Sequence, residues 1–151
     1  MSDAVYRKQD IACEYLDLAF QLFIEQRSYF CVIHLAAAAE EILGMHLPEH
    51  ERAFTKNLKA QIAMIALESN EKYQDIKARK EAVSIINYSK NNVKHMSEME
   101  DQVTINPVHE ATWWLEQALK NHAKLGLPIT PAQRQFKSMR AHKIQKENGD
   151  Q

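Results

Sequence analysis

The sequence predicts an all-α protein: a single-domain antiparallel helical bundle of four core helices, with one or two additional C-terminal helices. Three observations predict this class. The chain has 151 residues, 45% hydrophobic and 26% charged, which is the composition of one ordinary globular domain. It contains only 3 glycines and 4 prolines, too few for the turns of an all-β fold. Apolar residues recur at steps of three and four along several segments, the spacing of an amphipathic helix.

The first two predicted helices, residues 3–26 and 29–45, are expected to form an antiparallel hairpin. Ser28 follows a short break in the apolar pattern and is a suitable N-cap for the second helix. The second helix contains a run of alanines, residues 36–39, which lets a neighbouring helix approach closely. In the first helix, the apolar residues that recur at helical steps and their two flanking residues are Ile11, Tyr15, Leu18, Leu22, Ala19 and Phe23.

Two further helices are predicted in the middle of the chain. Pro48 ends the second helix, and Thr55 can cap a third helix that runs to residue 67. A fourth helix is expected over residues 71–95. The acidic segment 97–105 then lacks the helical period, so the fourth helix is predicted to end before it.

The fifth and sixth predicted helices begin at clear capping signals. Asn106 and Pro107 place an amide at the N-cap and a proline at the first helical position of the fifth helix. Thr130 and Gln133 have the spacing of a capping box, which starts a sixth helix that runs to residue 146.

The chain is predicted to consist of a helical bundle over residues 1–126, an appended basic helix over 127–146 and a frayed tail over 147–151. The sixth helix has a thin apolar side that includes Phe136, so it is expected to pack loosely or to dock on a protein partner. A basic helix of this kind attracts polyanions, although it can also be a solvated face. Its basic residues, with no acid among them, are Arg134, Lys137, Arg140, Lys143 and Lys146.

Several classes of protein are disfavoured by simple features. No segment approaches the ~18 apolar residues of a membrane span, and residues 1–10 are too polar for a signal peptide. Cys13 and Cys31 do not form a C-x-x-C pair, which favours buried free thiols in a reducing compartment. The glycines are isolated, so a phosphate-binding glycine loop is excluded. We therefore expect a cytoplasmic protein that does not enter the membrane.

The 7 histidines do not form a recognisable metal motif. The Glu-x-x-His pattern of di-iron bundles does not occur in the sequence. His46 and His50 have ligand-like spacing, but Pro48 lies between them, so they are not expected to share a helix face. His122 is expected on the surface. The sequence therefore predicts no metal site and no cofactor.

The strongest candidate site is the end of the fourth predicted helix, which carries Lys90, Asn91, Lys94 and His95. At 3.6 residues per turn, Asn91, Lys94 and His95 occupy neighbouring positions on one face, and Lys90 lies about one turn before Lys94. Such a cluster can hold a phosphate, and its imidazole can move a proton near neutral pH. The alternative is that the two lysines only complement the helix dipole.

Glu40 is a candidate partner for this cluster. Its place in the second helix turns it toward the apolar stripe, and a buried carboxylate needs a partner. Lys90, Lys94 or His95 can supply that partner if the second and fourth helices are adjacent. Glu40 would then orient the cationic cluster. The alternative is that Glu40 and Glu41 both face solvent.

Residues 33–44 and 90–95 together resemble two segments of the HEPN-domain family, which consists of small helical bundles found in prokaryotic defence and toxin systems. The family signature is an arginine followed after four to six residues by a histidine, often with a polar residue directly after the arginine. Here His95 matches the histidine and Asn91 the polar residue, while Lys90 stands where the family has arginine. The resemblance covers roughly residues 8–126.

The resemblance implies a metal-independent ribonuclease whose cleft forms where two copies meet. His95 would act as general acid or base at a ribose 2′-hydroxyl, Lys90 would stabilise the phosphate, and Asn91 would orient it. Independently of the resemblance, the spacing of the cluster makes Lys94 a second candidate phosphate contact. Lysine keeps the charge of arginine but lacks its bidentate fork.

Two functional hypotheses follow from these observations. The first is an RNA-processing protein, or an RNA- or nucleotide-binding protein, that uses the end of the fourth helix. The second is a non-catalytic dimeric interaction module, antitoxin-like or scaffold-like, whose basic C-terminal helix docks on a partner. Both include a homodimer, which the alanine-rich second helix and the adjacent Trp113 and Trp114 favour.

Overall fold

The structure is a computed structural model that describes residues 3–69, 75–94 and 102–149, with side chains described for all of these except 66–69, 75–76, 143–144 and 147–149. Within this part of the chain there are six α-helices, one short 3-10 helix and no strand, which confirms the all-α prediction. The elements are α1 (Lys8–Ile24), α2 (Tyr29–Met45), η1 (Glu49–Glu51), α3 (Ala53–Ser69), α4 (Asp75–Lys94), α5 (Pro107–Lys124) and α6 (Pro131–Gly149).

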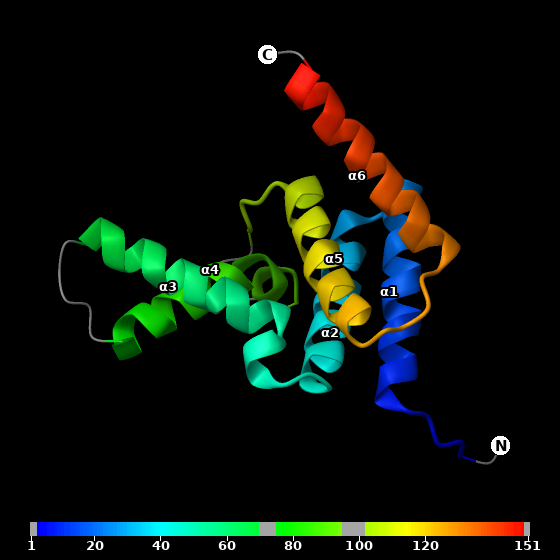
Figure 1. The fold of residues 1–151 in the computed structure, drawn as a ribbon, viewed down its shortest axis with the longest axis horizontal. Helices are drawn as coiled ribbons and strands as arrows, with labels where there is room; N and C mark the ends of the chain where they lie inside the picture. The colour runs from blue at the N-terminus through cyan, green and yellow to red at the C-terminus, as the bar shows by residue number, and fades with distance from the viewer. Residues whose placement is uncertain (1–2, 70–74, 95–101, 150–151) are drawn as a thin grey trace.

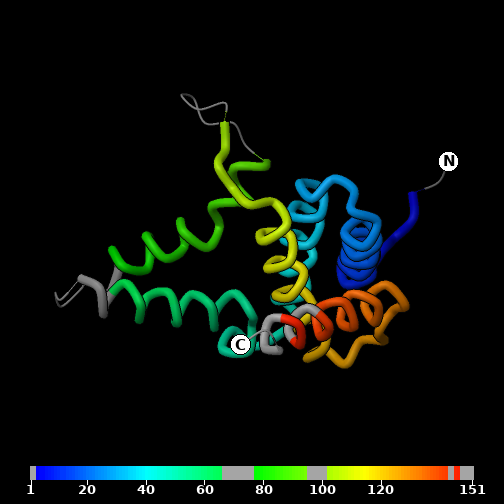
Figure 2. The backbone as a smooth tube through the Cα atoms, turned by 90° about the horizontal axis from the view of Figure 1, so that it is seen from above, coloured from blue at the N-terminus to red at the C-terminus, as the bar shows by residue number. Residues whose placement is uncertain are grey.

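The helices form a bundle with two projections (Figures 1 and 2). The most extensive contacts join α1 to α2 and α2 to α5, so these three helices make the body of the bundle. The short connection between α1 and α2 makes them an antiparallel hairpin, as predicted. A second hairpin, α3 and α4, extends away from the body, and the C-terminal half of α6 extends in another direction (Figure 1).

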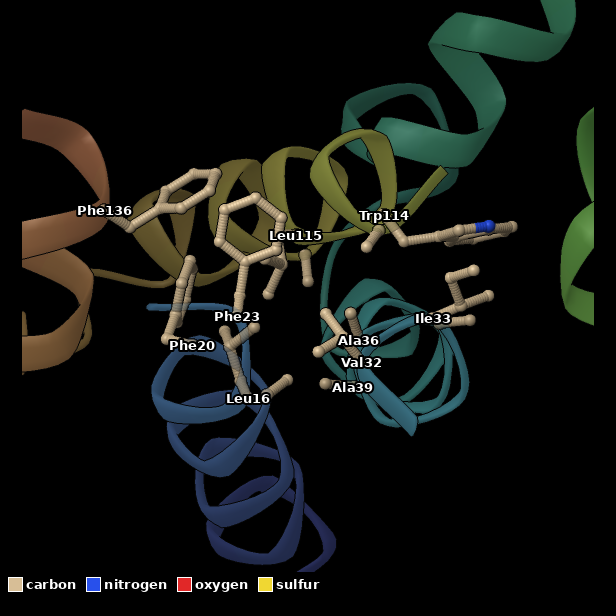
Figure 3. Packing of buried hydrophobic residues seen from close by; sticks show 14 of the residues in the cluster. Leu16, Phe20, Phe23, Val32, Ile33, Ala36, Ala39, Trp114, Leu115 and Phe136 are labelled. Carbon is tan, nitrogen blue, oxygen red and sulfur yellow. The ribbon is translucent and has the colours of Figure 1, made fainter. Parts of the chain in front are cut away.

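The main core lies where α1, α2 and α5 meet (Figure 3). Large side chains of α1 and α5 fill it, and small side chains of α2 let the helices approach closely. Phe20 and Trp114 are each at most 1% exposed. The buried residues that Figure 3 labels are Leu16, Phe20, Phe23, Val32, Ile33, Ala36, Ala39, Trp114, Leu115 and Phe136.

The apolar residues of α1 divide between two faces. The flanking residues Ala19 and Phe23 are buried, whereas the recurring residues Tyr15 and Leu18 are 37% and 45% exposed. The periodicity therefore identified the helix, but α1 begins at Lys8 and not at residue 3, and the periodicity did not identify the core face. The residues of α1 that are buried are Ala12, Leu16, Ala19, Phe20 and Phe23.

Two predicted helix caps are confirmed. The Asn106 side chain accepts a hydrogen bond of 3.1 Å from the backbone N–H of His109 at the start of α5. At the start of α6, the backbone N–H of Gln133 donates to Thr130 Oγ1, and the backbone N–H of Thr130 donates to Gln133 Oε1, both at 3.3 Å.

Two other expectations about helix starts differ from the structure. Ser28 occupies the N-cap position of α2 but makes no capping bond, because its hydroxyl lies 3.0 Å from Cys31 Sγ. Thr55 lies inside the first turn of α3, since that helix begins at Ala53. The backbone donors at the start of α3 are bound by side chains from other helices, as described below.

The expectation that α6 packs loosely is wrong for its first two turns. Phe136 is 1% exposed, and its ring centroid lies 5.0 Å from that of Phe20 and 5.4 Å from that of Phe23. Gln133 is also buried, and its Nε2 lies 3.5 Å from Nε2 of His122. The helix continues to Gly149, beyond the predicted end at residue 146.

His122 is buried, whereas the sequence placed it on the surface. The residue is only 2% exposed, and burial lowers the pKa of the imidazole, so the neutral form is favoured. The loop after α5 brings the start of α6 against His122 through Gln133, which a helical pattern alone does not reveal.

Candidate functional site

The structure places three of the four residues of the predicted cluster at the end of α4. Lys90 is half-buried, and Asn91 and Lys94 are exposed. His95 lies outside the described residues. The described part of the cluster is therefore two cations and an amide on the last turns of one helix.

Lys90 is held between α2 and α5. Its Nζ lies 3.6 Å from Glu41 Oε2 and 5.6 Å from the centroid of the Trp114 ring. The Trp114 ring is itself fixed, because its Nε1 donates a 3.0 Å hydrogen bond to Ser89 Oγ. A cation within about 6 Å of an indole ring gains on the order of 1 kcal/mol. Lys90 therefore has a defined position, with its charge partly balanced by Glu41.

Glu40 is buried, 4% exposed, as the first of the two alternatives predicted. Its hydrogen-bond partners differ from those proposed: Oε1 accepts from the backbone N–H of Phe54 at 3.2 Å and from Asn121 Nδ2 at 3.1 Å. The charge of Lys90 also acts on Glu40, although more weakly than burial or these hydrogen bonds. Burial raises the pKa of the Glu40 carboxyl above its usual range.

Glu40 and Asn121 together cap the start of α3. Asn121 Oδ1 accepts a 2.8 Å hydrogen bond from the backbone N–H of Ala53, and its Nδ2 also donates to the Glu40 carbonyl at 3.0 Å. Side chains of α2 and α5 therefore satisfy two of the four N–H groups that a helix start leaves without partners. Gly44 fits this arrangement, because a Cβ there would lie 3.0 Å from Asn121 Nδ2.

A pocket of about 240 Å³ opens beside this network. It lies between α2 and α4, and the start of α3 closes one side. The Asn87 side chain lines it, and Asn87 Oδ1 is shielded from water without a hydrogen-bond partner in the part of the chain that is described. Its lining residues are Glu40, Glu41, Gly44, Met45, Arg52, Phe54, Asn87 and Lys90.

Lys94 does not line this pocket. It lines a separate hollow with Val93 and with residues of α2 that include Phe30 and His34. The structure therefore brings Lys90 together with Glu40 and Glu41, but it places Lys94 at a neighbouring hollow one turn further along α4.

The α3–α4 hairpin is rich in exposed cations, among them Lys56, Lys59 and Lys80. Lys56 also lies beside Lys124 at the end of α5. The close approach of the Lys56 ammonium lowers the pKa of the Lys124 ammonium, which also donates to the Glu51 carbonyl. The hairpin therefore presents a surface on which anions are favoured.

Other kinds of site find less support. No group of three or more His, Cys, Asp or Glu side chains that could hold a metal ion occurs among the described residues. None of the helices in the described ranges has both the length and the apolar character that crossing a bilayer requires. Comparisons with family models, curated proteins and solved structures give no match for this chain.

Sequence reasoning missed Asn121, Asn87 and Arg52 as residues of the site. Asn121 meets Glu40 from 81 positions away, and no local pattern connects them. The buried position of Glu40 was a usable signal, since a buried carboxylate requires donors nearby. It indicated a partner but not which helix would supply it.

Proposed function

We propose that this chain is a HEPN-like protein that binds RNA through the end of α4 and cleaves it without a metal. Lys90 and Lys94 would hold phosphate oxygens, and Asn91 would orient the phosphate. His95, the next residue after the described end of α4, would take or give the proton at the ribose 2′-hydroxyl.

The observation that carries the proposal is the fixed position of Lys90. Its ammonium lies over Trp114 and beside Glu41, at the rim of a pocket, rather than extending freely into solvent. A lysine that only complements a helix dipole needs no such contacts. Exposed Lys94 follows one turn later, and the cations of the α3–α4 hairpin extend the positive surface on which a polyanion can bind.

The test of catalysis uses single-stranded and structured RNAs with excess chelator. We expect the native protein to cleave and the His95→Ala variant to lose at least 100-fold in rate, because general acid–base catalysis contributes on the order of 10²–10⁴-fold. His142→Ala is the matched control, since His142 is exposed on α6. Cleavage that persists in His95→Ala, or that the two variants reduce equally, would contradict a catalytic role for His95.

A second candidate function, the dimeric interaction module, is favoured by the incompletely buried outer face of the α1–α2 hairpin. Apolar residues recur there at steps of four and three on both helices, and three of them, Leu22, Leu35 and Ile42, also pack partly against the main core. Leu18 and Met45 are 45% and 66% exposed. The residues at these steps are Ile11, Tyr15, Leu18 and Leu22 on α1, and Cys31, Leu35, Ala38, Ile42 and Met45 on α2. The C-terminal half of α6, which extends from the bundle, would then dock on a different protein (Figure 1).

The size of this face suits a second copy of the chain. Each helix has 17 residues and is therefore about 25 Å long. Two such helices side by side cover about 500 Å² per protomer, so a dimer would bury about 1,000 Å², the lower bound of specific interfaces.

We expect a dimer at micromolar concentration and a monomer for Leu18→Lys, because the lysine would place a charge in the apolar contact. Sedimentation velocity measures the mass of both proteins. Ile85→Lys is the matched control, since Ile85 is 49% exposed on α4. A native monomer at 100 µM, or a dimer that Leu18→Lys leaves intact, would contradict this interface.

A further inference from the structure

The pocket beside Lys90 carries both hydrogen-bond donors and hydrogen-bond acceptors on a partly apolar surface. Glu41 supplies a carboxylate whose side chain is 70% exposed, and its contact with Lys90 at 3.6 Å is too long for a good hydrogen bond. Asn87 supplies an amide whose oxygen has no partner within the described structure. Lys90 and Arg52 supply donors, and Phe54 supplies an aromatic ring.

Glu41 and Lys90 are available to a ligand at low cost, whereas the Asn87 oxygen is shielded by the protein itself. Surface ion pairs contribute about 0–1 kcal/mol, and the Glu41–Lys90 pair has one exposed partner and a long 3.6 Å separation, so a ligand can replace this contact easily. Arg52 uses its Nε to donate to the Leu47 carbonyl at 3.1 Å, which fixes the guanidinium at the pocket wall. The Phe54 backbone N–H donates to Glu40, so the backbone position of the aromatic residue in the pocket wall is fixed.

The volume restricts the kind of ligand. At about 240 Å³ the pocket is smaller than the roughly 300 Å³ at which sites for drug-sized molecules begin. A single planar ring system fits this space better than an entire nucleotide. The sugar and phosphate would remain outside the pocket, toward the exposed end of α4.

We propose that this pocket binds a guanine base. The two donors on the Watson–Crick edge of guanine, N1–H and the N2 amino group, match the two oxygens of the Glu41 carboxylate. Its acceptors O6 and N7 lie on the major-groove edge and match the guanidinium of Arg52 and the ammonium of Lys90, and such groups recognise this edge in nucleic acids. The Lys90 ammonium has three donors, so it can contact the base and a phosphate oxygen at the same time. The base can pack on Phe54.

The other bases match the pocket less well. Adenine and cytosine each offer one amino group next to an acceptor nitrogen of the ring. That nitrogen would face a carboxylate oxygen of Glu41, and two acceptors repel each other. Uracil offers a single N–H between two carbonyls. The inference rests on the proposed RNA-binding function, because the guanine would belong to the bound RNA. It adds that the protein prefers RNA with a guanosine next to the bound phosphate.

Calorimetric titration with GMP, IMP and AMP tests this pocket. All three carry the same ribose and phosphate, so differences between them report the base alone. IMP lacks only the N2 amino group. We expect GMP to bind at least about 10-fold more tightly than IMP or AMP, in line with the discrimination that one bidentate base contact provides.

The Glu41→Gln variant should lose this preference, because the amide presents one acceptor in place of two. Since Glu41 is 70% exposed, the substitution leaves the fold intact. Glu14→Gln is the matched control, because Glu14 is exposed on α1 and does not line the pocket. Equal affinities for the three nucleotides, or a GMP preference that Glu41→Gln does not change, would overturn the proposal.

The outcome is separable from that of the proposed function. RNA binding without a GMP preference would remove the guanine pocket and leave the RNA-binding role of α4 in place. A GMP preference that Glu41→Gln abolishes, in a protein that does not bind RNA, would support the pocket and overturn the proposed RNA function.

Discussion

Phe136→Ala is expected to lower the free energy of unfolding by about 3–5 kcal/mol, the usual range for removing a buried phenylalanine. Phe136 is 1% exposed and packs on the rings of Phe20 and Phe23, so its removal leaves a cavity that rigid aromatic neighbours cannot fill. Chemical unfolding followed by circular dichroism measures the change.

Met139→Ala on the same helix is the control. Met139 is 41% exposed, and we expect a change within about 0.5 kcal/mol. The difference between the two variants tests whether Phe136 anchors α6 to the bundle. A loss of less than about 1 kcal/mol for Phe136→Ala would indicate that α6 is held loosely, as its thin apolar side alone suggests.

Glu40→Ala is expected to destabilise the protein by about 2–4 kcal/mol. The substitution removes the acceptor for the Phe54 backbone N–H and for Asn121 Nδ2, and each buried donor left without a partner costs about 1–3 kcal/mol. Because Asn121 also binds the Ala53 N–H, the start of α3 should loosen with it. Urea unfolding measures the change, and hydrogen exchange at the start of α3 locates it.

Glu41→Ala is the neighbouring control and should cost less than about 1 kcal/mol, since exposed ion pairs contribute little. Equal effects of the two substitutions would contradict the capping role of Glu40.

The raised pKa of Glu40 also predicts a pH dependence. In the unfolded chain this carboxyl titrates near 4.5, and in the folded protein it titrates at a higher pH. Between these values the folded state binds more protons, so the stability that Glu40 contributes is fully present below pH 4.5 and decreases as pH rises through the folded pKa. Glu40→Gln should remove this part of the pH dependence.

The sequence was sufficient to predict the class of fold and the positions of several helix ends. Asn106 and Thr130 are local signals, because a cap and its partner lie within one turn of each other. Apolar spacing located the helices for the same reason. These features depend on residues three or four positions apart, and sequence patterns report such separations directly.

The packing faces could not be predicted in the same way. The helix α1 carries apolar residues on two faces, and only the positions of α2 and α5 decide that Phe20 is buried and Leu18 is not. His122 is buried because the start of α6 lies against it through Gln133, which depends on a loop. The partners of Glu40 come from α3 and α5, each brought to it by the whole fold.

The candidate site was predicted in part. The sequence placed Lys90, Asn91 and Lys94 on one helix end, and the structure agrees for these described residues. The contacts that position Lys90, with Glu41 and Trp114, involve helices far apart in sequence. The predicted role of His95 stays a prediction.

The central claim, that RNA phosphates bind at the end of α4, is tested most directly by the salt dependence of RNA affinity. Fluorescence anisotropy with a labelled single-stranded RNA at several salt concentrations compares the native protein with Lys94→Ala and with Lys8→Ala, an exposed control on α1. We predict that Lys94→Ala weakens binding and reduces the slope of log K against log salt by about 0.7, the effect of one lost phosphate contact, while Lys8→Ala leaves both unchanged. Equal slopes for all three proteins, or no RNA binding by the native chain, would contradict the claim.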